Sequence, residues 1–299
     1  MTRLATLVLL VVTAVWGSTF YLTRDLVQTV PAPDYLGVRF AIAALVMVPL
    51  LHRQILALPR PLLYQGMGLG ALYTVAQLFQ TVGLEHTSAS RSGFITGLYV
   101  VLTPIIGWLV VKDRLPRTTW AAVVLAVIGL AVLSLAEVGW GYGETLTLIG
   151  SIWYAGHIVW LSRAGRPDAA LGLAAVQIGV LGVGSLIAAA PGGIMLPPTP
   201  ALWGSLLYMA FVSGALAMWA QTWAQSRIPA TRAAIIMTAE PVFAAAFAIW
   251  FGGEHLTLRM ILGGGLVLLA MYVVELSGRD PKATAEQDPP SELLHHEGA

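Results

Sequence analysis

Two groups of polar and aromatic residues share a spacing that suits the binding of an organic solute. Tyr73, Gln77 and Gln80 stand at positions i, i+4 and i+7. A second trio has the same spacing and consists of Trp153, His157 and Trp160. An α-helix has about 3.6 residues per turn, so each trio lies on one side of its helix. Amide, imidazole and phenol groups hydrogen-bond, and aromatic rings stack, so the pattern suits recognition of a ligand. For Gln77, Gln80 and Gln221, hydrogen bonds between helices are an equal alternative.

Two ionisable residues have more than one interpretation. His157 is a packed core histidine, a ligand contact or a proton-linked group, and its spacing alone does not choose among these. Glu240 is the only acidic residue near the middle of an apolar stretch, which makes it a candidate proton carrier. Its other interpretation is structural, because Pro241 follows directly and the carboxyl group could satisfy backbone donors at a kink. We expect the structural role.

Composition places these residues in a membrane. The chain has 299 residues, of which 57% are hydrophobic and 10% are charged, and its mean hydropathy is +0.78. Soluble domains average about 45–50% apolar and about 25% charged residues, so neither a soluble globular protein nor a disordered chain fits. A net charge of +1 gives no attraction for nucleic acid, and the absence of cysteine excludes disulfides and thiolate metal sites.

Ten apolar segments of 17–24 residues follow one another along the chain. They are Leu4–Leu22, Tyr35–Leu51, Leu62–Leu84, Ser90–Val111, Thr118–Leu135, Leu146–Ser162, Ala169–Ala190, Ala201–Ala224, Ala230–Phe251 and Leu256–Leu276. Spanning β-strands would be about ten residues long and alternating, so these continuous runs predict transmembrane helices. Residues 277–299 are polar and contain three prolines, which predicts a disordered tail.

The distribution of lysine and arginine predicts the orientation. With ten spans, one side of the membrane holds Arg3, Arg53, Arg60, Lys112, Arg114, Arg117, Arg163, Arg166, Arg227, Arg232, Arg279 and Lys282. The other side holds Arg24, Arg39, Arg91 and Arg259. Cytoplasmic loops are enriched in basic residues, so both termini are predicted to be cytoplasmic.

The chain also repeats itself. A shift of 141 residues superposes Gln80-Thr81 on Gln221-Thr222 and Arg91 on Arg232. Each repeat therefore contains five spans, and because five is odd the second copy is inverted in the membrane. We predict repeats at residues 1–138 and 139–276. Inverted repeats around a midplane site are a recurring architecture of secondary transporters.

Several short motifs resemble the drug/metabolite transporter superfamily, specifically its ten-helix EamA-type members. They are Ala14-Val15-Trp16-Gly17-Ser18-Thr19-Phe20, Val38-Arg39-Phe40, Thr87-Ser88-Ala89-Ser90, Leu102-Thr103-Pro104, Lys112-Asp113-Arg114-Leu115, Ala239-Glu240-Pro241-Val242-Phe243 and Gly253-Glu254-His255-Leu256. Within this group the aromatic-rich core is similar to YddG-type amino-acid exporters. Two departures are Lys112-Asp113-Arg114, where the family often has Gly-Glu-Arg, and Pro229 before the ninth span.

The resemblance implies an all-α membrane protein with ten helices in two inverted five-helix repeats around a central cavity. It also implies that spans 1, 3, 4, 6, 8 and 9 line this cavity. The candidate substrate-binding residues on these spans are Trp16, Ser18, Thr19, Tyr73, Gln77, Gln80, Tyr99, Trp153, His157, Trp160, Trp219, Gln221 and Met237. Few of the lining residues are charged, so we expect a nearly neutral cavity suited to zwitterions.

We therefore expect a multi-pass transporter of the bacterial cytoplasmic membrane that exports amino acids, including aromatic or large neutral ones, or similar small metabolites. The export direction comes from the resemblance. A drug or nucleotide-sugar carrier of the same fold is the first alternative, and a non-transporting receptor or scaffold is the second. No enzyme motif, phosphate-binding loop, cofactor site or metal site is expected. The expected partners are a small-molecule substrate and the lipid bilayer, with the protein a monomer or weak dimer.

Overall fold

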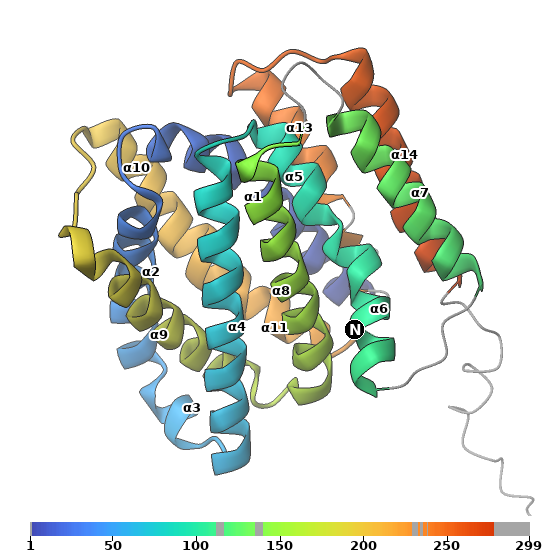
Figure 1. Ribbon diagram of the computed structural model, residues 1–299. Helices are drawn as coiled ribbons and strands as arrows, with labels where there is room; N and C mark the ends of the chain where they lie inside the picture. Colours follow the sequence, from blue (N-terminus) through green and yellow to red (C-terminus); the bar gives the residue numbers. More distant parts are fainter. Residues whose placement is uncertain are drawn as a thin grey trace, which may run out of the picture.

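A computed structural model describes residues 2–111, 117–134, 140–228, 233, 236–237 and 239–277 (Figure 1). Within these ranges the regular structure consists of helices, and they contain no strand. Six expected features lie outside the described residues: the Lys112-Asp113-Arg114 motif, the end of the fifth span at Leu135, Pro229, the start of the ninth span at Ala230, Arg232, and the tail after Ser277.

The helices of the first half follow the five predicted spans. They are α1 (Thr2–Val27), α2 (Ala32–Leu50), the short α3 (His52–Leu56), α4 (Arg60–Leu84), α5 (Ala89–Gly97), α6 (Tyr99–Val111) and α7 (Arg117–Ser134). The fourth predicted span corresponds to two helices, α5 and α6, that meet at Leu98. The amide of Leu98 donates to the carbonyl of Ile95, three residues back, so the chain tightens at this junction.

The second half repeats this order. It contains α8 (Tyr142–Ala164), α9 (Ala170–Ala189) with the short η1 (Ala190–Gly192), α10 (Pro200–Tyr208), η2 (Met209–Leu216), α11 (Ala217–Gln225), α13 (Glu240–Trp250) and α14 (Leu258–Ser277). The segment η2 is a π-helix, and α10, η2 and α11 run without interruption through the eighth predicted span.

Prolines and side-chain caps set several helix starts. Proline at the first turn costs no hydrogen bond, and α2 has Pro33 there, while α4 has Pro61. The Thr199 hydroxyl accepts a hydrogen bond from the Leu202 amide at the start of α10. The first helical residue of α2, Ala32, lies three positions before the predicted start of its span. Residues that follow it, including Arg39, therefore lie deeper in the helix than predicted.

Length and composition allow five of the described helical segments to cross a membrane. These are residues 3–27, 32–50, 89–110, 170–192 and 200–225. Shorter apolar helices cover residues 120–129, 240–250 and 258–270.

Helices of one half pack against helices of the other half, and the contacts are related by the repeat. The pairs α2 with α9, α7 with α14, and α5 with α13 each join equivalent spans of the two repeats. The contact between α4 and α8 has its counterpart in the contact between α11 and α1, and that between α6 and α8 in that between α13 and α1. Figure 1 shows α7 and α14 side by side at the edge of the bundle. Neither half packs as a separate bundle, so the protein interior lies between the halves.

Glycines allow the closest of these helix approaches. A Cβ atom at Gly17 would overlap Phe243 of α13, and one at Gly70 would lie 3.0 Å from the Gln177 carbonyl of α9. A Cβ atom at Gly129 would lie 2.9 Å from the Gly263 carbonyl of α14. Small residues at such crossings let membrane helices approach and gain van der Waals contact.

Candidate functional site

A central cavity lies between the two halves. Its volume is about 50 Å³, so it is narrow. Its walls come from α1, α4, the α5–α6 pair, α8, η2 with α11, and the region around α13. These are the six spans that the resemblance implies. The described structure adds a seventh contributor, α2, through one arginine.

Ten of the residues singled out in the sequence line this cavity. They are Trp16, Thr19, Tyr73, Gln77, Gln80, Tyr99, His157, Gln221, Met237 and Glu240. They come from helices far apart in the chain and from both halves. The fold therefore brings most of the predicted cluster together.

Four other candidates lie outside the cavity. Ser18 faces a second groove and its hydroxyl is 2.9 Å from the Tyr208 hydroxyl. Trp153 and Trp160 are 39% and 36% exposed, and the Trp160 ring packs against Gly68 of α4. Trp219 is half-buried and packs against the hydrophobic core.

Trp153 and Trp160 lie outside the cavity because α8 turns a different side toward the cavity from the one that the sequence predicts. Tyr154, one residue after Trp153, and Ile158, one residue after His157, line the cavity beside His157. Gly68 has no side chain, so the Trp160 ring occupies the space left on the outer side of the contact between α4 and α8.

Several lining residues were not predicted. They are Phe20, Thr23, Arg39, Thr81, Leu84, Thr96, Tyr154, Ile158 and Ser213. Most are hydroxyl or apolar residues without a distinctive sequence signal. Arg39 is the exception, and its position in the chain did carry a signal.

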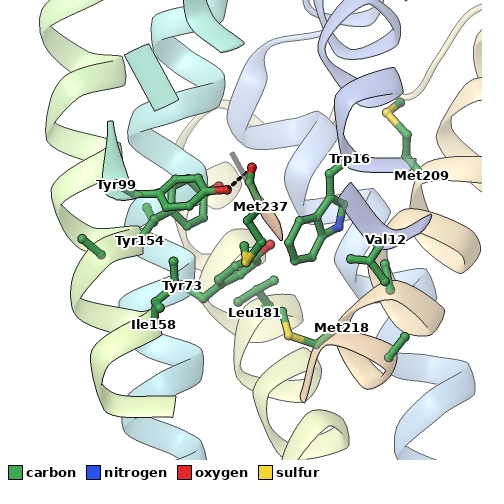
Figure 2. Close-up of a cluster of buried hydrophobic side chains, with 14 of the residues drawn as sticks. Val12, Trp16, Tyr73, Tyr99, Tyr154, Ile158, Leu181, Met209, Met218 and Met237 are labelled. Atoms are coloured by element: carbon green, nitrogen blue, oxygen red, sulfur yellow. Dashed lines mark hydrogen bonds between the residues drawn. The ribbon is translucent and has the colours of Figure 1, made fainter. Parts of the chain in front are cut away.

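Aromatic rings form one wall of the cavity. The Tyr73 ring lies 5.3 Å from that of Tyr154 and 5.0 Å from that of His157, between ring centroids. Tyr99 meets Tyr154 edge to face at 6.5 Å. Figure 2 shows the three tyrosines on one side and Trp16 on the other, with Met237 between them. This wall offers an apolar surface to a ligand side chain.

A chain of hydrogen bonds joins three residues of the cavity wall. The Tyr154 hydroxyl donates to Gln80 Oε1 at 2.8 Å, and Gln80 Nε2 donates to the Thr96 hydroxyl at 3.0 Å. These bonds hold the Gln80 amide in one orientation. By contrast, Gln221 Oε1 is buried without a hydrogen-bond partner among the described residues. An unsatisfied buried acceptor in a cavity wall is a candidate ligand contact.

His157 has partners within the protein. Its Nε2 atom lies 2.8 Å from Gln177 Oε1, and its side chain is 1% exposed. Gln177 is a fully buried residue of α9, which corresponds to the seventh span and is not among the spans expected to line the cavity. The hydrogen bond to Gln177 and the ring contact with Tyr73 are those of a histidine packed in a protein core. The same imidazole also lines the cavity. The His157 imidazole is therefore both packed in the core and part of the cavity wall.

Glu240 opens α13 and faces the cavity. Its Oε2 atom accepts a hydrogen bond from the Tyr99 hydroxyl at 2.8 Å. Among the described residues this phenol is its side-chain partner, whereas the structural interpretation expected backbone donors. Its carboxyl group therefore connects helices from the two repeats.

Arg39 corrects the expectation of a nearly neutral cavity. The sequence pattern places it with the charges on one side of the membrane, but its side chain is 5% exposed and lines the cavity. It lies seven residues after the start of α2, which at about 1.5 Å per residue is about 10 Å along the helix. Pro31 and Pro33 mark that start in the sequence and could have revealed the depth of Arg39.

Polar contacts tie the loops together at one end of the bundle. The Glu144 carboxylate accepts hydrogen bonds from the Thr87 hydroxyl at 2.7 Å and from Arg91 at 2.9 Å. Glu254 accepts from the Ala89 amide at 2.8 Å. Glu144 precedes the apolar run of α8. Its burial raises the pKa of its carboxyl, but the bonds from Thr87 and Arg91 outweigh burial and hold the pKa below its usual value.

No group of three metal-ligating side chains occurs within the described residues. The cavity walls offer aromatic rings, amides, hydroxyls, one imidazole, one carboxyl group and one guanidinium. Such a site can bind and release an organic solute.

Comparison with known proteins identifies the family. Residues 3–135 and 141–276 each match the EamA-like transporter family. The chain belongs to this family. It is an all-α integral membrane protein of the drug/metabolite transporter superfamily, with ten transmembrane helices in two inverted five-helix repeats around a central cavity. The resemblance seen in the sequence is confirmed.

Relatives of this EamA-like protein are transporters by name. An uncharacterized transporter of Archaeoglobus fulgidus is 33% identical over 91% of this chain and 86% of its own length. The Escherichia coli inner membrane transporter YedA is 28% identical over 88% of this chain and 87% of its length. The human UDP-galactose translocator is 24% identical over 76% of this chain and 65% of its length. The protein is thus a multi-pass membrane transporter.

The fold also matches a crystal structure with a TM-score of 0.70, covering 93% of this chain and 98% of the other. The two sequences are 16% identical. This likeness concerns the arrangement of the helices alone.

Proposed function

We propose that this EamA-like transporter exports amino acids, including aromatic or large neutral ones, and similar small metabolites across the bacterial cytoplasmic membrane. The observation that carries the proposal is the central cavity, which combines an aromatic wall with amide, hydroxyl and oppositely charged groups. Trp16, Tyr99 and Tyr154 would contact an apolar side chain. Gln77 and Gln221 would offer hydrogen bonds to the polar end of the solute.

The proposed transport mechanism is a movement of one half of the protein against the other. The cavity lies at the interface of inverted repeats, so rocking of one half against the other would expose it to each side of the membrane in turn. The arginine and lysine distribution supports cytoplasmic termini. The outward direction rests on the resemblance to amino-acid exporters. Net flux would follow the substrate gradient, or a proton gradient if Glu240 or His157 titrates during the cycle.

Transport of a nucleotide sugar is the second candidate, because the UDP-galactose translocators are relatives. A nucleotide diphosphate carries two or more negative charges, and proteins bind such groups with several arginine or lysine side chains. The cavity walls contain one cation, Arg39, and one carboxyl group, Glu240. This balance favours a net-neutral solute.

Counterflow in proteoliposomes tests the proposal. Vesicles loaded with unlabelled L-phenylalanine should accumulate external radiolabelled L-phenylalanine, and a panel of other amino acids inside should support exchange to different degrees. Protein-free vesicles give the background. Exchange of UDP-galactose without exchange of any amino acid would establish the second candidate instead. Binding of an amino acid with no flux would indicate a receptor.

A further inference from the structure

Arg39 is a buried cation whose partners are all neutral. Its Nε atom donates to the Met209 carbonyl at 3.1 Å, one terminal nitrogen to the Tyr35 hydroxyl at 2.8 Å, and the other to the Ser213 hydroxyl at 2.9 Å. The Phe40 ring lies 4.7 Å from its central carbon. A guanidinium carries five N–H groups, so two remain for a further acceptor.

No carboxylate pairs with Arg39 among the described residues. The ion pairs there join Arg24 to Glu254, His86 to Glu85 and Arg91 to Glu144, all away from the cavity. An unpaired charge within a membrane protein is costly and marks a ligand pathway more often than a packing element. Because Arg39 also lines the cavity, an anionic group of a bound solute is the missing partner.

An acidic residue, Glu240, lines the same cavity as Arg39. Glu240 accepts a hydrogen bond from Tyr99 and has no cation within ion-pair distance among the described residues. Arg39 and Glu240 both line this cavity, so the two charges face a shared space. The unpartnered Gln221 Oε1 atom adds an acceptor to this space.

We infer that Arg39 binds the carboxylate of the transported solute, while Glu240 and Gln221 Oε1 accept hydrogen bonds from its ammonium group. This inference rests on the proposed function and narrows the substrate class to zwitterions with both groups free. A zwitterion suits such a site because its two groups neutralise both charges. The planar guanidinium matches a carboxylate with two parallel N–H groups.

Ligand analogues test the inference on the unaltered protein. Competition against radiolabelled L-phenylalanine would be measured with 2-phenylethylamine, which lacks the carboxylate, and 3-phenylpropionate, which lacks the amine. Each analogue should bind about tenfold or more weakly than L-phenylalanine, because each loses charge-assisted hydrogen bonds. Equal binding of 2-phenylethylamine would overturn the role of Arg39, and equal binding of 3-phenylpropionate that of Glu240.

Variants of Arg39 and Glu240 test the two roles separately. In Glu240→Gln the preference for L-phenylalanine over 3-phenylpropionate should fall toward one, while the preference over 2-phenylethylamine persists. Arg39→Gln should show the opposite pattern, and Arg39→Lys should retain part of the carboxylate preference. Arg227→Gln is the matched control, since Arg227 stacks on Trp223 outside the cavity, and both preferences should be unchanged in it.

These preferences are ratios within one preparation, so a smaller folded fraction does not alter them. If Arg39→Gln does not fold, Arg39→Lys and the analogues on the unaltered protein decide the question. Unchanged ratios in both Arg39→Lys and Glu240→Gln would overturn the inference and leave the proposed function intact. Binding of UDP-galactose without any amino acid would overturn both.

Discussion

The Tyr99 hydroxyl donates a hydrogen bond to Glu240 Oε2 at 2.8 Å, and these residues are 141 positions apart. That separation equals the shift that superposes the two halves of the sequence. The bond therefore joins equivalent positions of the two repeats, one on α6 and one on α13. The same hydroxyl lies 3.2 Å from the Met237 carbonyl, the contact drawn as a dashed line in Figure 2. A polar link between the repeats thus forms part of the cavity wall.

Replacing Tyr99 by phenylalanine should weaken this link. Loss of the phenol leaves the Glu240 carboxyl without its described donor, which is expected to cost about 1–3 kcal/mol of unfolding free energy. Thermal unfolding in detergent and L-phenylalanine counterflow would both be measured, and both should decrease. Tyr64→Phe is the matched control because Tyr64 is 67% exposed. Equal behaviour of the two variants would show that the bond contributes little.

Substitutions on α8 should separate the cavity side from the outer side. His157→Ala removes a cavity-lining ring and the hydrogen bond to Gln177, so counterflow should fall severalfold. Trp160→Ala removes a partly exposed ring that packs on Gly68, so counterflow per folded molecule should remain close to that of the unaltered protein. Folded protein would be quantified by size-exclusion chromatography. A larger transport loss in Trp160→Ala would place the binding surface on the other side of α8.

The contact between α1 and α13 depends on Gly17. Alanine there would place a methyl group against Phe243, and overpacking of this kind costs about 1–3 kcal/mol. Gly265→Ala is the control, because no atom lies within 4 Å of the added carbon and alanine favours helix over glycine. Melting temperatures in detergent should therefore fall for Gly17→Ala and stay level or rise for Gly265→Ala. The reverse order would contradict the packing described for α1.

The Glu144 network should give an acid-dependent stability. Its pKa in the folded protein lies below the usual value of 4.5, so the unfolded chain binds the proton more readily. The contribution is fully present above pH 4.5 and is lost as the pH falls through the lower, folded pKa. Glu144→Gln should remove this part of the acid dependence, whereas Asp168→Asn, on an exposed residue, should not. Unfolding curves from pH 6 to pH 3 would compare the variants.

The predicted orientation is testable because the chain has no cysteine. A single cysteine at Asp168 should be protected from an impermeant maleimide in intact cells, and one at Gly192 should react. Both positions are exposed, in consecutive loops on either side of α9. Labelling after permeabilisation provides the control for reactivity. Reaction of the cysteine at position 168 alone would show that the orientation is opposite to the predicted one.

Much of the fold was predictable from the sequence. Apolar runs bounded by charges, prolines and glycines predicted where helices lie, because backbone groups in lipid must pair within a helix. The early starts of α2 and α8 have local causes. Pro33 begins α2 earlier than the apolar run, and the Glu144 carboxylate accepts a hydrogen bond from the Gly141 amide and begins α8 earlier.

The sequence by itself determined the membrane class, the duplicated architecture and a stripe of polar and aromatic residues on each of several helices. Only the tertiary structure decided which way each stripe faces, since periodicity defines a face relative to the helix axis and neighbouring helices choose its rotation. Gly68 receives Trp160 on the outer side of α8, and so Tyr154 and His157 turn inward. Likewise, hydrogen bonds to Met209 and Ser213 of η2 hold Arg39 in the cavity, and those partners lie 170 and 174 residues away in the chain.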